Sequence, residues 1–245
     1  MKYKVICKYD GSNYSGFQSQ INAPSVQDEI ERCLSIFLKE PVKILLCSRT
    51  DAKVHALGQV FQFRYEQDIN RDAFIYNLNN LLNDDIRLID IEQVAEDFHC
   101  RKNIEYKHYR YLIDTDKNDV FMRNYAYLCP YRLDFDKLVE GSKIFIGKHD
   151  FTSYNATPID LIPDQVREIY QIDIRKEDDL IIIDYYGDGF LRYMIRLITG
   201  MLIEYARGHY ELDYLKKMLD EPSKDYNRYN VTGAGLYLVE VVYKQ

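Results

Sequence analysis

The chain opens with KYKVICKY at residues 2–9, where aromatic or apolar side chains occupy every second position from Tyr3 onward. This period of two predicts a strand with one buried face. A loop rich in Gly, Ser and Asn follows over 10–24, and Ser25 with Asp28 three residues later predicts the capped start of a helix. The N-terminal segment is therefore predicted to be a strand joined by a loop to a helix.

Similar patterns recur along the whole chain and predict an α+β protein. We expect two similar half-domains of mixed, mostly antiparallel sheet, with helices packed on one face and the active-site cleft between the halves. The N-terminal half-domain is placed at 1–103 and the C-terminal half-domain at 104–245. Further strands are expected at 42–47, 59–65, 86–94, 104–114, 166–174, 180–186 and 236–243, and further helices at 70–82, 134–146, 190–205 and 212–219.

Composition is typical of a soluble globular protein, with 47% hydrophobic and 29% charged residues among 245. The longest apolar stretch, 189–203, is interrupted by Arg192 and Arg196, so we expect no membrane span. The first residues lead directly into a strand pattern, so no signal peptide is expected. Five scattered cysteines without CxxC spacing favour a reduced cytoplasm over a zinc site.

The charge balance restricts how this chain can bind nucleic acid. Lys and Arg number 32 and Asp and Glu number 39, which leaves a net charge of −7. Because nucleic-acid binders are usually basic, an RNA-binding role requires that the cations gather on one face. The 23 tyrosines and absent tryptophan suit base stacking, but aromatic residues are also frequent in strands, so composition leaves both interpretations open.

A polar loop at 48–57 separates two predicted strands and is a candidate site. In it Arg49 and Asp51 flank a threonine, and His55 follows closely. Taken alone these residues are weak evidence, because a loop aspartate is usually a turn or cap residue.

Six stretches in chain order carry a stronger signal. They are YDGSNYSGFQSQ at 9–20 with SVQ at 25–27, RTDA at 49–52 with VHA at 54–56, FHCR at 98–101 with YRY at 109–111, GKHDFTSY at 147–154, FLRYMIR at 190–196 and GLYL at 235–238. Together they resemble the TruA family of tRNA pseudouridine synthases. The resemblance spans nearly the whole chain, and six ordered matches make chance similarity very improbable.

The resemblance implies an isomerase that breaks the glycosidic C–N bond of uridine, turns the uracil and rejoins it through carbon. Asp51 is then the catalytic nucleophile, Arg49 helps hold the flipped nucleotide, and Tyr109 stacks on the uracil and is available for a later proton transfer. The resemblance matches Arg196 to the arginine that pairs with the catalytic aspartate. The reaction requires no cofactor and no metal. Whether the carboxylate attacks the base or the sugar stays open.

The same resemblance implies tRNA as partner, contacted at the anticodon stem-loop and elbow by a cytoplasmic homodimer. The expected RNA contacts are cationic or histidine side chains: Arg101, Lys107, Arg110, Arg192, His55 and Lys53. Cations of this kind grip phosphates and position RNA without reading sequence. The alternative for Arg101, Lys107 and Arg110 is a solvated strand face. For Arg192 and Arg196 it is an ion pair with Asp184 or Asp188.

Some positions depart from the family pattern. Ser48 and Lys53 stand where the family usually has glycine, Tyr193 stands where it has histidine, and 230–234 lack its proline. A glycine at such points often permits a positive φ or a close backbone approach. These departures keep open a catalytically inactive, tRNA-binding paralogue. An unrelated aspartate-nucleophile hydrolase is disfavoured because the chain lacks a P-loop, a Gly-rich elbow and an acidic metal cluster.

Overall fold

The computed structural model describes residues 1–116 and 118–244 and divides them into two compact units. The first unit holds Met1–Glu105 together with the chain from Tyr237 onward, and the second holds Tyr106–Leu236. The chain passes from the first unit to the second between Glu105 and Tyr106, close to the boundary expected at 103/104. The last strand, placed by the sequence in the C-terminal half, lies in the first unit because Tyr237 and Leu238 pair with His55 and Ala56.

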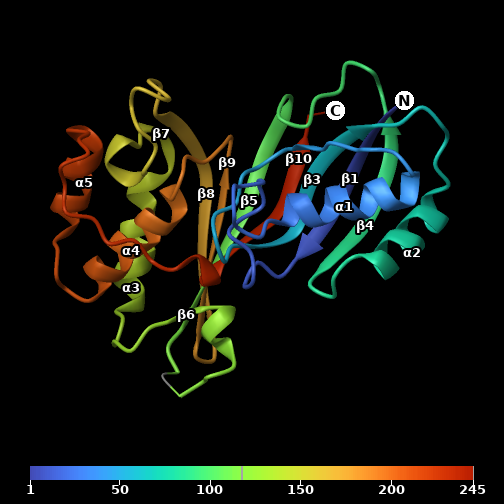
Figure 1. Cartoon of the computed structure of the whole chain (residues 1–245). Helices are drawn as coiled ribbons and strands as arrows, with labels where there is room; N and C mark the ends of the chain where they lie inside the picture. The colour runs from blue at the N-terminus through green and yellow to red at the C-terminus, as the bar shows by residue number, and fades with distance from the viewer. Residues whose placement is uncertain (117, 245) are drawn as a thin grey trace. The chain divides into compact units, whose positions relative to one another are not determined.

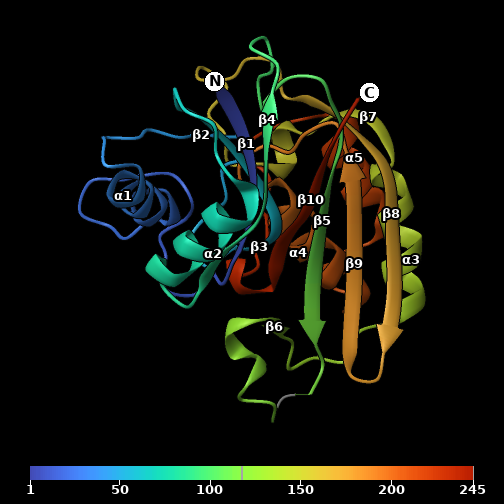
Figure 2. The same ribbon diagram turned by 90° about the vertical axis from the view of Figure 1, so that its right-hand side faces the viewer.

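The first unit is a sheet covered by two helices. Its strand order is β4-β1-β3-β10, with β2 also beside β3; all these pairs are antiparallel except β3 with β10. Figures 1 and 2 show α1 and α2 on one face of this sheet. The elements are β1 (Lys2–Tyr9), α1 (Val26–Leu38), β2 (Leu45–Leu46), β3 (His55–Arg64), α2 (Arg71–Leu81), β4 (Ile86–Val94) and β10 (Leu236–Tyr243).

Alternation in the strands explains how this unit buries its core. Val5 and Cys7 of β1 are fully buried, and the ring of Phe63 on β3 stacks on Phe74 of α2 at 6.0 Å. Helix α1 begins as predicted, since the Ser25 hydroxyl accepts a hydrogen bond from the Asp28 N–H. The opposite face has its own cluster around Cys47, Val60 and Cys100.

The second unit is a sheet with the strand order β5-β9-β8-β7, with the short β6 parallel to β5. Helices α3 and α4 lie on one face of this sheet (Figures 1 and 2). The elements are β5 (Ile104–Asp114), β6 (Tyr127–Leu128), α3 (Phe135–Ser142), β7 (Gly147–Asp150), β8 (Val166–Glu177), β9 (Leu180–Gly187), α4 (Met194–Ala206) and α5 (Leu212–Asp220). Short 3-10 helices occupy Met122–Asn124, Lys143–Phe145, Thr152–Tyr154 and Gly233–Gly235.

The α+β class and most elements are confirmed. β3 begins at His55, four residues before the predicted start, and β8 ends at Glu177, three residues after the predicted end. Three further bounds differ for local reasons. The strand expected at 42–47 shrinks to Leu45–Leu46, because the N–H groups of Val42 and Ile44 donate to side chains of α1 instead of a neighbouring strand. The helix expected from 190 begins only at Met194, after a residue with positive φ. The helix expected through 146 ends at Ser142 and continues as a 3-10 turn.

No helix among the described residues is long and apolar enough to cross a membrane.

Candidate active site

The predicted nucleophile lies in the loop that joins β2 to β3. Asp51 is half-buried, whereas Arg49 two residues earlier is exposed to solvent. Thr50 between them is buried and its hydroxyl lies 2.8 Å from the Tyr9 hydroxyl. Thr50 therefore anchors the loop to β1, and its two neighbours stay nearer the surface.

Two glycines of the 10–24 loop bring backbone against the Asp51 loop. At Gly11 a Cβ atom would lie 2.1 Å from the Val54 carbonyl oxygen, so no side chain fits there. At Gly16 φ is +112° and a Cβ atom would lie 2.5 Å from the Thr50 carbonyl oxygen. The Phe17 N–H donates to that same oxygen at 3.3 Å. The N-terminal motif thus serves as the support of the aspartate loop.

Lys53 adopts the backbone conformation that the expected glycine would allow. Its φ is +65°, and its N–H donates to the Tyr14 carbonyl at 3.2 Å. Ser48, the other departure from the family pattern, is buried, and its N–H and carbonyl both bond the Gln59 side-chain amide. The loop keeps a glycine-like turn at Lys53 and needs no such turn at Ser48.

His55 is a buried residue at the start of β3. Its Nδ1 accepts a hydrogen bond from the Gly11 N–H at 3.1 Å, and its ring stacks on Tyr237 at 4.7 Å. Its exposed fraction is 2%. These contacts join the 10–24 loop to the aspartate loop, while its predicted contact with RNA stays a prediction.

Tyr109 belongs to β5, opposite Tyr185 of β9. Its ring meets the Phe190 ring edge to face, with centroids 5.2 Å apart and planes inclined by 76°. Its exposed fraction is 7%. The FLR motif therefore contributes a side chain that orients the predicted stacking tyrosine.

Arg196 lies in the first turn of α4. Its Nε donates to the Val231 carbonyl at 2.7 Å, and its guanidinium carbon lies 4.4 Å from the centroid of the Tyr193 ring. The guanidinium carbon of Arg192 lies 4.8 Å from the same centroid. Tyr193 has φ +62°, so the chain turns sharply just before the helix, and its ring contacts both arginines.

A buried carboxylate organises the cations of β5 and β8. Asp184 on β9 accepts hydrogen bonds from His108 Nε2 at 2.7 Å, from Arg110 Nε at 2.8 Å and from Arg175. Burial alone raises the pKa of Asp184, but the hydrogen bonds from His108, Arg110 and Arg175 outweigh it and hold the pKa well below its usual range. Asp184 is thus ionised and paired with these cations, not with Arg196.

The remaining predicted RNA contacts have varied surroundings. The Arg101 side chain is exposed, although its Nε donates to the Leu46 carbonyl at 2.8 Å. Lys107 is half-buried on β5, and Arg192 is exposed. Their contacts with RNA stay predictions.

Comparison with known proteins decides the family. A family model described as tRNA pseudouridine synthase matches residues 142–244. A tRNA pseudouridine synthase A of Bacillus pumilus is 40% identical over 99% of both chains. Proteins with the same name from Exiguobacterium sibiricum (38% identical, 100% of this chain, 97% of the relative) and Acetivibrio thermocellus (37%, 98% of each) are similar.

The chain belongs to the TruA family of tRNA pseudouridine synthases.

Membership in the TruA family confirms the predicted isomerase class. The described residues contain no cluster of His, Cys, Asp or Glu with the geometry to hold a metal ion. Two features of this TruA-family site were missed by sequence reasoning: the convergence of cations on Asp184 and the aromatic contact of Tyr193 with both arginines. The first depends on the register of three strands and left no local signal, whereas the FLRYMIR spacing places Tyr193 between its two arginines.

Proposed function

We propose that this protein converts uridine to pseudouridine in the anticodon stem-loop of tRNA, at the family positions 38–40, with Asp51 as nucleophile. The observation that carries the proposal is full-length similarity to synthases of that name, together with a half-buried aspartate on a loop held by Gly11 and Gly16. A supported loop is what a nucleophile requires, because small misplacements cost large factors in rate.

The chemistry is an internal rearrangement that conserves the atoms of the nucleotide. The bond from ribose C1′ to uracil N1 breaks, a bond from C1′ to C5 forms, the proton on C5 leaves and N1 gains one. The Asp51 carboxylate serves as the nucleophile, which forms a covalent intermediate between bond breaking and bond formation. We assign Arg196 to pair with Asp51 and keep it ionised, since a neighbouring guanidinium favours the charged carboxylate.

Base flipping assigns roles to the other predicted residues. Extruding a uridine costs a few kcal/mol, and stacking on one aromatic ring returns about 1–3 kcal/mol. We assign the stacking role to Tyr109, whose ring is already oriented by Phe190, and the later removal of the C5 proton to its hydroxyl. The exposed Arg49 is assigned to hold the flipped nucleotide, and Lys53, Arg101, Lys107, Arg110 and Arg192 to contact the RNA backbone.

We further propose that the protein acts as a homodimer in the cytoplasm, with tRNA contacting both subunits. A net charge of −7 disfavours nonspecific RNA binding by one chain, so two subunits must join their cationic surfaces. All five cysteines are free and buried, which suits a reducing compartment. Sedimentation at micromolar concentration should give the mass of two chains; a monomer would remove this part of the proposal.

The decisive experiment measures tritium release from tRNA labelled at uracil C5. Wild type should release label, and Asp51→Ala and Asp51→Asn should lower the rate by at least about 1,000-fold. Asp97→Ala is the matched control, because Asp97 is also an aspartate but exposed and outside the site. It should retain wild-type activity.

The tritium assay distinguishes an active synthase from an inactive, tRNA-binding paralogue. Tight tRNA binding by wild type without tritium release would identify the inactive, RNA-binding paralogue instead. Transcripts in which uridines 38–40 are replaced by cytidine test the position. They should release no label, and release from them would move the target elsewhere in the tRNA.

A further inference from the structure

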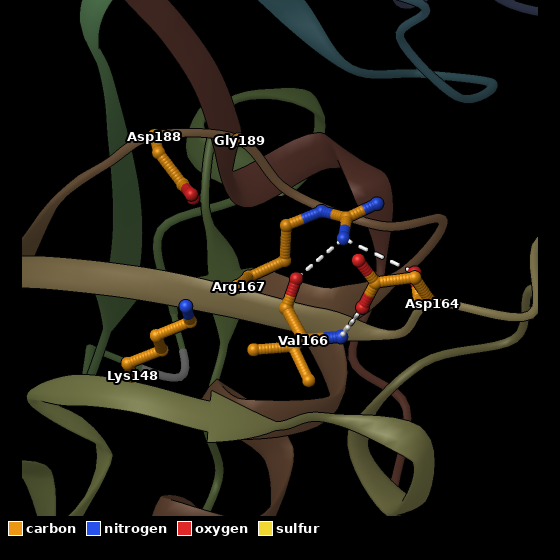
Figure 3. A pocket seen from close by; sticks show the side chains of 6 residues that line it. All are labelled: Lys148, Asp164, Val166, Arg167, Asp188 and Gly189. Atoms are coloured by element: carbon orange, nitrogen blue, oxygen red, sulfur yellow. Dashed lines mark hydrogen bonds between the residues drawn. The ribbon is translucent and has the colours of Figure 1, made fainter.

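A polar pocket of about 440 Å³ lies in the second unit, outside the residues assigned above. It is formed where β7, the start of β8 and the turn after β9 meet. Figure 3 shows its six lining residues, which are Lys148, Asp164, Val166, Arg167, Asp188 and Gly189. Two cations and two carboxylates therefore share one small space.

Arg167 is held in place by backbone rather than by an acid. Its NH1 donates to the carbonyls of Asp164 and Val166, as Figure 3 shows. Within the described residues no carboxylate lies within ion-pair distance of its guanidinium. Its remaining N–H groups are thus fixed in direction and have no acceptor in the part of the chain that the structure describes, and such preorganisation lowers the cost of binding an anion.

Lys148 supplies the second cation of the pocket. It lies on β7, is exposed and has no ion pair among the residues that the structure describes. Figure 3 shows its ammonium and the Asp188 carboxylate pointing toward the space between β7 and the turn after β9. Two other cations of this sheet, Arg110 and Arg175, each form an ion pair with Asp184.

The two acids have structural partners. Asp164 Oδ1 accepts from the Val166 N–H at 3.0 Å, and Asp188 Oδ1 accepts from the Glu168 N–H at 3.0 Å. Each leaves its second oxygen without a protein donor in the described part of the chain. The pocket thus offers donors for one negative group and acceptors for a hydroxyl, which together match the phosphate and 2′-OH of a ribonucleotide.

The pocket also lies next to the predicted stacking residues. Gly189 lines it, and Phe190, the next residue, packs its ring on Tyr109. A strand of RNA whose target base stacks on Tyr109 has its neighbouring backbone in this region.

We propose that this pocket binds a backbone phosphate of the substrate RNA near the flipped nucleotide, with Arg167 and Lys148 as its donors. The inference rests on the proposed function for the identity of the RNA. The pocket's zero net formal charge favours a phosphodiester, which carries one charge, over a free phosphate, which carries about two at neutral pH.

The test is the salt dependence of tRNA binding by Arg167→Gln and Lys148→Gln. Each phosphate contact contributes about 0.7–0.9 to the slope of log K against log salt concentration. Because both cations bind the same phosphate, we expect each variant to lower the magnitude of the slope by up to that amount between 50 and 200 mM salt. Affinity at 50 mM salt should fall about 5- to 20-fold.

Lys176→Gln is the matched control. Lys176 is exposed on the same strand β8 and its replacement removes the same charge, so its slope should equal that of wild type. Since Arg167 also donates to two carbonyls, its replacement can disturb the turn; Lys148 makes no such bond in the described residues, so Lys148→Gln tests the site without that effect.

Equal slopes for wild type, Lys148→Gln and Arg167→Gln would overturn the phosphate site, even if the enzyme is active. Reduced slopes in both variants, together with a wild type that binds tRNA but releases no tritium, would support the site while the proposed catalysis fails. The two proposals therefore fail separately.

Discussion

The guanidinium carbon of Arg196 lies 4.4 Å from the centre of the Tyr193 ring, within the range of a cation–π contact. The Arg196 Nε also donates to the Val231 carbonyl, so the group is held by a ring and by a backbone oxygen. The sequence places a tyrosine where the resembled family usually has histidine. Tyr193 is thus a positioning residue for the arginine assigned to Asp51.

Replacing Tyr193 by leucine should lower the maximal rate of tritium release about 3- to 30-fold, because a cation–π contact of this kind is worth about 0.5–2 kcal/mol. Tyr193→Phe keeps the ring and loses only the hydroxyl that accepts from Arg192 at 3.2 Å. It should keep the rate while tRNA affinity changes by no more than about threefold. A similar rate loss in both variants, or a loss only in KM, would contradict a role for the ring in positioning Arg196.

Adding a single methyl group at Gly11 should greatly lower the rate of tritium release. A Cβ atom there would lie 2.1 Å from the Val54 carbonyl oxygen, so Gly11→Ala must push the aspartate loop away. A displacement of about 1 Å costs about 100-fold in rate, and tritium release at saturating tRNA should fall by that factor.

Gly208→Ala is the control for this prediction. Gly208 has φ +78° but no atom within 4 Å of a Cβ, so only backbone strain of about 1–2 kcal/mol is added. Its activity should stay at the wild-type level. Full activity in Gly11→Ala would show that the loop does not depend on this close approach.

Lys53 carries backbone strain that glycine would remove. A left-handed residue costs roughly 1–2 kcal/mol, and glycine loses about 0.5–1 kcal/mol to chain flexibility. Lys53→Gly should therefore raise the free energy of unfolding by about 0.5–1 kcal/mol, measured by urea denaturation. Lys53→Ala keeps the strain and loses the charge, so its stability should match wild type. If both variants lose tRNA affinity equally, the amine and not the turn contacts RNA.

Strands whose extent is set by their own alternation of apolar and polar residues were predictable from the sequence. The bounds of β4, β5 and β10 follow from alternation and are confirmed. The short β2 was not predictable, because its extent depends on side chains of α1 that accept the Val42 and Ile44 N–H groups. The late start of α4 likewise depends on Tyr193 taking a positive φ.

The candidate site likewise combines residues placed by local motifs with residues brought together by strand pairing. The loop of Asp51 and the helix of Arg196 follow from local motifs. The convergence of His108, Arg110 and Arg175 on Asp184 requires the register of β5, β9 and β8. Strand order could not be inferred from one sequence, so of these three residues only Arg110 was singled out, as a predicted RNA contact.

Asp184 predicts a specific pH dependence of stability. Its pKa is held well below the unfolded value of about 3.9, because the hydrogen bonds from His108, Arg110 and Arg175 outweigh burial. A depressed carboxyl pKa stabilises the fold at pH values above the unfolded pKa, and this stabilisation is lost as the pH falls toward the folded pKa. Asp184→Asn should lower the free energy of unfolding by about 3–5 kcal/mol at pH 7, because it leaves the guanidinium groups of Arg110 and Arg175 without their carboxylate. The difference from wild type should be constant between pH 5 and 8 and shrink below pH 4.

Should Asp184→Asn fail to fold, Arg175→Gln removes one hydrogen-bond partner of Asp184 and should lower the free energy of unfolding by about 1.5–3 kcal/mol. Urea denaturation at pH 7, 5 and 3.5 checks both variants, and a difference that does not shrink at pH 3.5 would show that the charge of Asp184 does not stabilise the fold.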